Sequence, residues 1–392
     1  MNTKFPMVKP DYFGNSLVNL MVSLGEAFGR PAVDYPPLGL LSDVALSRAK
    51  NVVLILVDGL GDALLQKVGG GSVLGAHRLG RLTSVTPSTT ATAVTTVMTG
   101  LAPQQHGLTG WHMFFQELGA ILAVLPGRAR YGGVGLADAG IDVAAFFNHP
   151  SFFDGLSGKS IVFSPKAIEG SAFNRVHVGS AESRPYGSLG TFFDGMRARL
   201  SLDEKRHLIY GYWSDLDHIA HTSGSLSGAW ADAFEAFDQA FSRFLESLAG
   251  TDTVVLVTAD HGFVDIGPND TVDLDHHPAI RSCLTMPLCG EGRLAYAYVR
   301  PRWTDRFEER IRMELGDQVH LVPSHQLVEE GWFGLGTPHK VLLQRVGDYA
   351  LLMRQPMLIR DYLPFERRQP MVGVHGGVSP DEMWVPLVVA CP

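Results

Sequence analysis

The chain has 392 residues, of which 45% are hydrophobic and 18% charged, and its formal net charge at pH 7 is −8. This composition is typical of a globular protein with a substantial core, and it excludes extended disorder. The acidic balance argues against binding of nucleic-acid polymers, but an anionic small substrate stays open if local cations hold it.

The N-terminal segment and the cysteines indicate a compartment. Pro10 and Asp11 interrupt the apolar run that a signal peptide would need, and no stretch of about eighteen apolar residues could form a membrane-spanning helix. The cysteines at 283, 289 and 391 show no paired spacing, which is typical of a reducing compartment. We therefore expect a cytoplasmic protein that does not contact a membrane, with an oligomeric state that the sequence leaves open.

Short apolar runs alternate with helical patterns along most of the chain. Runs typical of strands buried on both faces occur at residues 51–59, 141–147, 207–213, 253–262 and 384–390, with a shorter one near 81–86. Helical patterns occupy residues 94–101 and 227–248, and we assign the aromatic stripe of the second helix to the core. The alternation predicts an α/β fold in which helices sandwich a mostly parallel sheet.

Residues 266–370 break this alternation. The pattern predicts a strand at 293–301, a helix at 305–315, a strand at 318–322, and an antiparallel pair at 348–354 and 357–363. We therefore predict a main domain of residues 1–265 plus 371–392, and a smaller, cap-like α+β insertion of residues 266–370.

Carboxylate and imidazole side chains follow the predicted strands of the main sheet. Ligands of open α/β sheets bind at the carboxyl ends of the strands, so these side chains are expected to meet at one edge. Aspartate and histidine are zinc ligands, and a two-metal site suits displacement at phosphorus. Each motif alone has a second interpretation as turn chemistry or a solvated pair, but together they predict a metal cluster. The residues are Asp58, Asp217, His221, Asp260, His261 and His375.

A threonine-rich segment, TSVTPSTTATAVTTVMTG at residues 83–100, follows the first of these strands. The apolar stripe that begins at Val94 places the start of a helix near residues 88–92. A hydroxyl there would lie at a helix N-terminus, where unpaired N–H groups favour an anion. A nearby metal ion could activate it as a nucleophile, although the pattern alone does not say which residue attacks.

The order of these motifs resembles the alkaline phosphatase superfamily, and most closely its nucleotide pyrophosphatase/phosphodiesterase family. The motifs are an Asp at a strand end, a threonine-rich segment that leads into TGLAPQQHG at 99–107, D-x-x-x-H-x-x-G at 217–224, ADHG at 259–262 and HGG at 375–377. The resemblance spans roughly residues 51–265 and 371–390, and it implies an alkaline-phosphatase-like fold.

The resemblance also implies two zinc ions, for which manganese or iron could substitute. It implies one set of ligands at Asp217, His221 and His375. It implies the second set at Asp58, Thr90, Asp260 and His261. The position of the family's nucleophile, counted back from Thr99, falls on Thr90, with Thr89 and Ser88 as neighbouring alternatives.

The implied reaction is hydrolysis of a small phosphodiester or nucleotide through a phosphothreonine intermediate, which water then hydrolyses. Relatives that cleave nucleotides carry an asparagine three residues after the nucleophile, where this chain has Ala93. Thr92 or the backbone at the helix start could replace that donor. Trp111 is a candidate for contact with the substrate, and so are Phe114 and Phe115; core packing is the alternative for all three.

Other functions remain open. A phosphomonoesterase of the same superfamily would need extra cations, and the absence of Arg and Lys between Ser84 and Trp111 favours diesters. A sulfatase would need a Cys or Ser in a segment that this chain lacks. A non-catalytic phosphate or metal sensor is the alternative from another class. Asp215 and His218 lie beside the expected ligands, and an error of register could exchange them. Asp275, His276 and His277 could line the site from the insertion, and a polar loop is the alternative for them.

Overall fold

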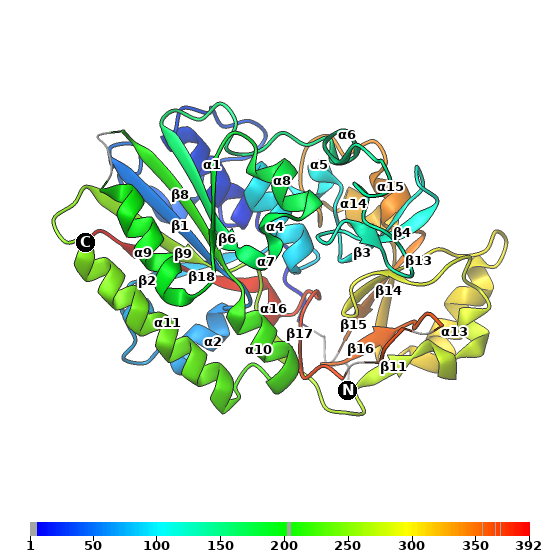
Figure 1. Ribbon diagram of the computed structural model, residues 1–392. Coiled ribbons are helices and arrows are strands. Elements are labelled where there is room, and N and C mark those ends of the chain that lie inside the picture. Colours follow the sequence, from blue (N-terminus) through cyan, green and yellow to red (C-terminus); the bar gives the residue numbers. More distant parts are fainter. Residues whose placement is uncertain (1–5, 202–204, 355, 365, 369) are drawn as a thin grey trace.

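Two seven-stranded sheets lie side by side in the molecule (Figure 1). The computed structural model describes residues 6–201, 205–354, 356–364, 366–368 and 370–392. The first sheet has the strand order β2-β18-β9-β1-β8-β6-β7, and the second has the order β14-β15-β13-β12-β3-β4-β5. The predicted α/β fold is confirmed by the first sheet, which is mostly parallel and sandwiched between helices.

The first sheet is built from the apolar runs that the sequence marks as buried strands. Its strands are β2 (Arg78–Thr83), β18 (Trp384–Ala390), β9 (Thr253–Thr258), β1 (Asn51–Val57), β8 (His207–Trp213), β6 (Lys159–Pro165) and β7 (Glu182–Tyr186). All seven residues of β1 are buried, because parallel neighbours and helices cover both of its edges and faces. Only β18 runs antiparallel to its two neighbours, β2 and β9, whereas the prediction treated it as parallel.

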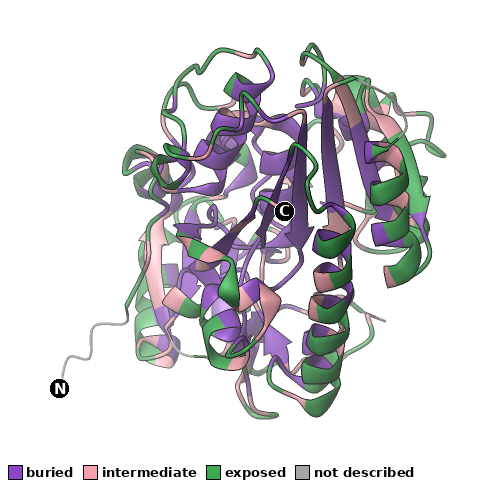
Figure 2. Ribbon diagram, turned by 90° about the vertical axis from the view of Figure 1, so that its left-hand side faces the viewer, coloured by how far each residue is buried: buried purple, intermediate pink, exposed green. Residues whose placement is uncertain are grey.

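Helices cover both faces of this sheet. On one side α9 (Leu189–Leu200) packs against α11 (Gly228–Ser247), and on the other α1 (Leu17–Ala27) packs against α4 (Thr90–Thr99). The aromatic stripe of α11 faces inward, with Trp230, Phe237 and Phe241 fully buried, so its assignment to the core is confirmed. Figure 2 shows the buried strands between helices whose outer faces are exposed.

The second sheet is antiparallel throughout and takes strands from two separate parts of the chain. They are β14 (Val319–Pro323), β15 (Tyr349–Met353), β13 (Leu294–Ala297), β12 (Cys289–Gly290), β3 (His112–Phe115), β4 (Ala120–Ala123) and β5 (Arg128–Ala129). The last three come from residues 112–129, which the prediction assigned to the main domain. The division of the chain at residues 266 and 370 stays a prediction, and helix α13 (Thr304–Leu315) lies where a helix was expected.

Two further local predictions are wrong. Residues 141–147 were expected to form a strand, but they contain α6 (Val143–Phe147), because the Asp142 side chain accepts hydrogen bonds from the amides of Ala144 and Ala145 and so caps a helix. The expected antiparallel pair of 348–354 and 357–363 does not form, since β16 (Leu358–Arg360) pairs in parallel with β11 (Thr271–Asp273). Hydrophobic periodicity fixes the face of a strand but not its partner.

The remaining elements are short, apart from the nine-residue α10. The helices are α2 (Asp62–Val68), α3 (Val73–Ala76), α5 (Pro103–His106), α7 (Lys166–Glu169), α8 (Ala172–Val178), α10 (Asp215–Ser223), α12 (Pro278–Arg281), α14 (Ser324–Glu329), α15 (Leu342–Arg345) and α16 (Pro380–Met383). The strands β10 (Val264–Asp265) and β17 (Gly373–Val374) pair with each other, and two 3-10 turns occupy Gly39–Leu41 and Leu274–His276. Within the described ranges, none of the helices has the length and apolarity that crossing a membrane requires.

A buried ion pair joins the two sheets. Arg293, directly before β13, donates two hydrogen bonds to Glu382 of α16, at 3.0 and 2.8 Å, and both side chains are at most 1% exposed. Glu382 also accepts hydrogen bonds from the amide of Gly377 and the hydroxyl of Ser379, at 2.8 and 2.6 Å. The pair therefore fixes the segment between β17 and β18 against the second sheet.

We expect Glu382→Ala to lower the free energy of unfolding by about 3–5 kcal/mol, because the variant leaves the Arg293 guanidinium buried without its carboxylate. Denaturant unfolding followed by circular dichroism measures the change. Asp194→Ala is the matched control, since it removes an exposed pair with Arg197, whose N and O atoms are 3.6 Å apart, and should cost at most about 1 kcal/mol. Equal losses in the two variants would contradict this role of Glu382.

Candidate metal centre and active site

The six predicted strand-end residues come together at one edge of the first sheet. Asp58 directly follows β1, Asp260 and His261 follow β9, and α10 after β8 carries Asp217 and His221. His375 follows β17 and reaches the same edge, because the antiparallel β18 begins where its neighbours end. The strand order, with β1 between β9 and β8, places these loops next to one another.

The first half of the cluster is buried. Asp58, Asp260 and His261 are at most 1% exposed. The His261 Nε2 atom lies 3.3 Å from Asp58 Oδ1 and 3.4 Å from Asp260 Oδ2. The hydroxyl oxygen of Thr90 lies 3.2 Å from the same nitrogen. One imidazole nitrogen thus faces two carboxylates and a hydroxyl.

The second half is more open. His221 Nε2 lies 3.2 Å from Asp217 Oδ1 and 3.3 Å from His375 Nε2, and His375 Nε2 lies 3.7 Å from the same oxygen of Asp217. His221 Nδ1 is 2.8 Å from the carbonyl oxygen of Gly373, which orients the ring so that Nε2 faces the cluster. The rings of His261 and His375 stack with centroids 3.6 Å apart, so the two halves are in contact.

The oxygens of this cluster are arranged for a cation. Asp58 Oδ1, Asp217 Oδ1 and Asp260 Oδ2 are buried and accept no hydrogen bond from any described residue. Burial raises the pKa of Asp58 and of Asp260, and a nearby aspartate raises each further. In the described part of the chain no Lys or Arg lies within ion-pair distance of these carboxylates. A metal ion would satisfy these oxygens, and their mixture with imidazole nitrogens suits zinc.

The ligand atoms form two overlapping groups within the described residues. One contains Asp58, Asp260 and His261, and the other contains Asp217, His261 and His375. The ligand sets that the family resemblance implies differ in two residues. They place His221 with Asp217 and His375, and they place His261 only with Asp58 and Asp260. The structure places all of these residues in one cluster, while the division between two metal ions stays a prediction.

Thr90 is the first residue of α4, as the expected helix start at 88–92 implied. Thr89 is the N-cap in extended conformation, but its hydroxyl does not cap the helix and donates instead to Glu291, at 2.7 Å. The amides of Thr90 and Ala91 have no hydrogen-bond partner among the described residues. The helix therefore presents free N–H groups beside the cluster, as an anion site requires.

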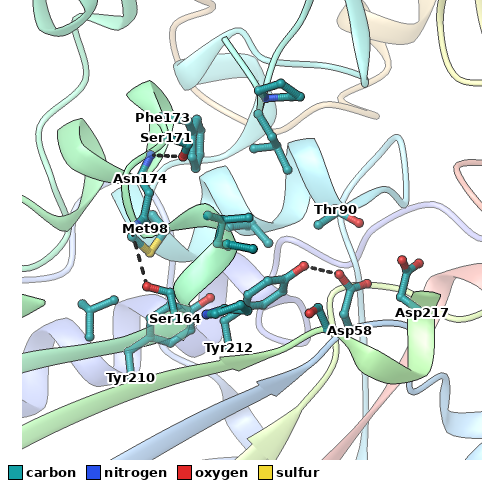
Figure 3. Close-up of a pocket in the computed structure, with 18 of the residues that line it drawn as sticks. Asp58, Thr90, Met98, Ser164, Ser171, Phe173, Asn174, Tyr210, Tyr212 and Asp217 are labelled. Carbon is teal, nitrogen blue, oxygen red and sulfur yellow. Dashed lines mark hydrogen bonds between the residues drawn. The ribbon is translucent and has the colours of Figure 1, made fainter. Parts of the chain in front are cut away.

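A cavity of about 430 Å³ opens beside Thr90, Asp58 and Asp217 (Figure 3). Its wall is mostly apolar and comes mainly from α4, α7, α8, β6 and β8, and among the described residues no Lys or Arg lines it. Tyr212 of β8 donates a hydrogen bond to Asp58 Oδ2 and so connects the cavity wall to the cluster. The residues that form the apolar wall include Val94, Met98, Trp111, Leu125, Phe173, Tyr210 and Tyr212.

The aromatic residues that line the cavity were only partly anticipated. Trp111 lies in the wall, as its prediction as a substrate contact requires. Phe114 and Phe115 do not line it and pack against Tyr298 and Phe146, so the core alternative holds for them. The sequence reasoning missed Tyr210 and Tyr212, although their spacing of two in a buried strand, just before the metal-ligand segment, was an available signal.

The other polar candidates lie outside this arrangement. Thr92 is fully buried and its hydroxyl has no partner in the described chain, but it is not part of the cavity wall. Asp215 and His218 are exposed on α10. Asp275 and His277 form ion pairs within the region of the second sheet, with Arg281 and Glu314 respectively, which is consistent with a polar loop.

Comparison with known proteins identifies the family. A model of the type I phosphodiesterase / nucleotide pyrophosphatase family matches residues 52–331. The chain belongs to this family. Membership supports phosphoester hydrolysis, and the resemblance to the alkaline phosphatase superfamily is confirmed. No curated protein matches the sequence.

Solved structures share the fold at low sequence identity. Murine ectonucleotide pyrophosphatase / phosphodiesterase 5 aligns with a TM-score of 0.63 at 15% identity over 87% of this chain and 88% of that chain. An inactive threonine-to-alanine variant of the murine protein, in complex with AMP, aligns at 0.62 and 16% identity over 86% and 87%. Phosphonoacetate hydrolase from Sinorhizobium meliloti 1021, in complex with phosphonoacetate, aligns at 0.58 and 16% identity over 86% and 89%.

We expect Tyr212→Phe to weaken zinc binding about 10- to 100-fold, because removal of the hydroxyl frees the Asp58 carboxylate that it orients. Competition with a chromophoric chelator measures the affinity. Tyr210→Phe is the matched control, since the Tyr210 hydroxyl lies beside the same cavity but has no hydrogen-bond partner in the described chain. If both variants bind zinc as the parent protein does, Tyr212 does not orient a metal ligand.

Proposed function

We propose that the protein is a zinc-dependent phosphodiesterase or nucleotide pyrophosphatase that forms a phosphothreonine intermediate on Thr90. The observation that carries this proposal is the Thr90 hydroxyl at the start of α4, 3.2 Å from His261 Nε2, in a cluster where one oxygen of each of three aspartates lacks a partner among the described residues. The threonine-to-alanine variant of the murine relative is inactive, which gives independent support for a threonine nucleophile in this fold.

The same residues would hold the metal ions. Asp217, His221 and His375 would bind one ion, and Asp58, Asp260, His261 and the Thr90 hydroxyl would bind the other. Two divalent cations here would favour the ionised form of the Thr90 hydroxyl and offset the charge that develops on the entering and leaving oxygens. Zinc suits the mixed nitrogen and oxygen donors, with manganese or iron as substitutes.

The proposed reaction has two steps. The Thr90 oxygen attacks phosphorus, and the bond from phosphorus to the leaving alcohol breaks. Water subsequently attacks the phosphothreonine and releases the second product, which returns the hydroxyl to Thr90. Throughout, the free amides of Thr90 and Ala91 are placed to donate to a phosphoryl oxygen, in the role that the missing asparagine at Ala93 would otherwise take.

The cavity beside Thr90 would take the substituent that stays on phosphorus. Its aromatic and aliphatic wall suits a nucleobase or another flat apolar group, and Asn174 and Ser164 add polar groups to the lining. The murine relative binds AMP, which makes a nucleoside monophosphate moiety the first candidate. A cytoplasmic location and action on small molecules are part of the same proposal.

A phosphomonoesterase is the second candidate function, and the lining of the cavity disfavours it. A monoester carries one more negative charge than a diester near neutral pH, so its recognition calls for additional cations. In the part of the chain that the structure describes, no Lys or Arg lines the cavity around Thr90.

We expect the zinc-loaded protein to hydrolyse bis-p-nitrophenyl phosphate faster than p-nitrophenyl phosphate, and Thr90→Ala to reduce kcat by at least about 10³-fold through loss of the nucleophile. Release of p-nitrophenol measures both rates. Thr90→Ser should keep part of the activity, because it keeps a hydroxyl.

Thr89→Ala and Ser88→Ala are the controls for the position of the nucleophile. If either of them loses activity while Thr90→Ala keeps it, the attacking hydroxyl is misassigned. Preference for the monoester would move the protein to the phosphatase branch. Inactivity on both substrates with two zinc ions bound would favour a sensor.

A further inference from the structure

The second sheet contributes a carboxylate to the edge of the active site. Glu291 lies in the tight turn between β12 and β13, where its amide donates to the carbonyl of Leu294, at 2.9 Å. Its Oε1 atom accepts hydrogen bonds from the Thr89 hydroxyl, at 2.7 Å, and from the amide of Trp111, at 2.8 Å. The carboxylate is thus held next to the residue that precedes the nucleophile.

Glu291 also contacts the loop that carries His375. Gly376, at φ +103°, has no side chain, and a Cβ atom built there would lie 2.7 Å from Glu291 Cβ and 2.8 Å from Cγ. The Glu291 side chain therefore occupies the space between the start of α4 and the His375 segment. It is only partly buried, and it lines a small cleft together with Trp111 and Arg360.

Geometry holds the Glu291 carboxylate in place, and its surroundings act on its charge in both directions. Burial, the largest effect, raises the pKa of Glu291, and the hydrogen bonds from Thr89 and the Trp111 amide and the neighbouring Arg360 and His261 offset this rise only in part. Both hydrogen bonds are donated to one oxygen, as a carboxylate accepts them. Arg360 forms no ion pair in the described chain and donates a hydrogen bond to the thioether of Met371. Arg360 therefore does not form a salt bridge with the Glu291 carboxylate.

We propose that Glu291 is a specificity-determining residue that makes this site select phosphodiesters over phosphomonoesters. The inference rests on the proposed function, because it concerns the phosphoryl group attacked by Thr90. A phosphodiester carries one negative charge, whereas a monoester near neutral pH carries about two. The Glu291 carboxylate is held 2.7 Å from the hydroxyl of Thr89, the neighbour of the nucleophile, and from there it repels the additional charge.

The same repulsion acts on the reaction product. Hydrolysis of a diester leaves a phosphomonoester, which carries the higher charge as soon as it forms. Glu291 then favours its departure from the site and limits inhibition by product. The second sheet therefore selects the substrate at the entry step and favours release of the product at the exit step.

The test compares Glu291→Gln with the parent protein on bis-p-nitrophenyl phosphate and p-nitrophenyl phosphate, after zinc content has been matched. The glutamine keeps an acceptor oxygen for Thr89 and Trp111 but removes the charge. We expect the ratio of kcat/KM for the monoester to that for the diester to rise about tenfold or more. Thr89→Ala, which removes one hydrogen bond but keeps the carboxylate, should leave this ratio unchanged.

Binding of inorganic phosphate, measured by titration calorimetry on the zinc-loaded proteins, is the second readout. Glu291→Gln should bind phosphate about tenfold more tightly than the parent protein at pH 8, where the dianion dominates. An unchanged ratio together with unchanged phosphate affinity would overturn the inference, as would equal losses on both substrates. If the parent protein hydrolyses neither substrate, the proposed function fails, and the phosphate affinities alone still decide the role of Glu291.

Discussion

The active-site edge of the first sheet depends on one constraint. Three aspartate carboxylates lie close together where water is scarce, and their negative charge has to be balanced by a positive one. Asp58 and Asp260 are essentially inaccessible, and together with Asp217 they leave oxygens without hydrogen bonds inside the described structure. Ionised carboxylates in such a place are costly unless a positive charge meets them. In the described chain, imidazoles rather than Lys or Arg lie next to them, and imidazole nitrogens together with carboxylate oxygens are ligands that a divalent metal ion such as zinc takes. A metal ion bound at this edge would therefore stabilise the folded state as well.

The rest of the fold holds this edge in place. The direction of β18 brings His375 to the carboxyl ends of strands that run the other way. The Arg293–Glu382 pair fixes the segment from His375 to β18 to the second sheet, and Glu382 also accepts a hydrogen bond from the amide of Gly377 in that segment. Such a buried pair has a high desolvation cost and therefore contributes little net stability. Loss of Glu382 would remove the carboxylate that offsets the buried guanidinium charge, so the main effect of the pair is to fix the geometry of this segment.

Much of this arrangement could be predicted from the sequence, because strand ends are a local signal. Asp58 and Asp260 come directly after unmistakable buried strands, and parallel strands bring the residues at their carboxyl ends to one edge. The start of α4 was equally accessible from the spacing that begins at Val94. Pairing between distant segments carries no such local signal, which is why the place of β3 to β5 in the second sheet was not anticipated and the partner of β16 was missed. The strands β6 and β7 were not anticipated either, since only the middle of β6 is buried and β7 is a charged edge strand.

Glu291 shows most clearly where sequence reasoning ends. It lies in a short turn within a region that has no recognisable motif, and about 200 residues separate it from Thr89, which contacts it. Only the packing of the second sheet against the first brings the two together. This topology separates two groups of side chains: the carboxyl edge of the first sheet gathers Thr90 and the candidate metal ligands, and the second sheet supplies the Glu291 carboxylate beside them. On the proposed roles, a change at Glu291 would alter which phosphoester is accepted without removing a candidate metal ligand. Selectivity at this site would then vary independently of the chemistry.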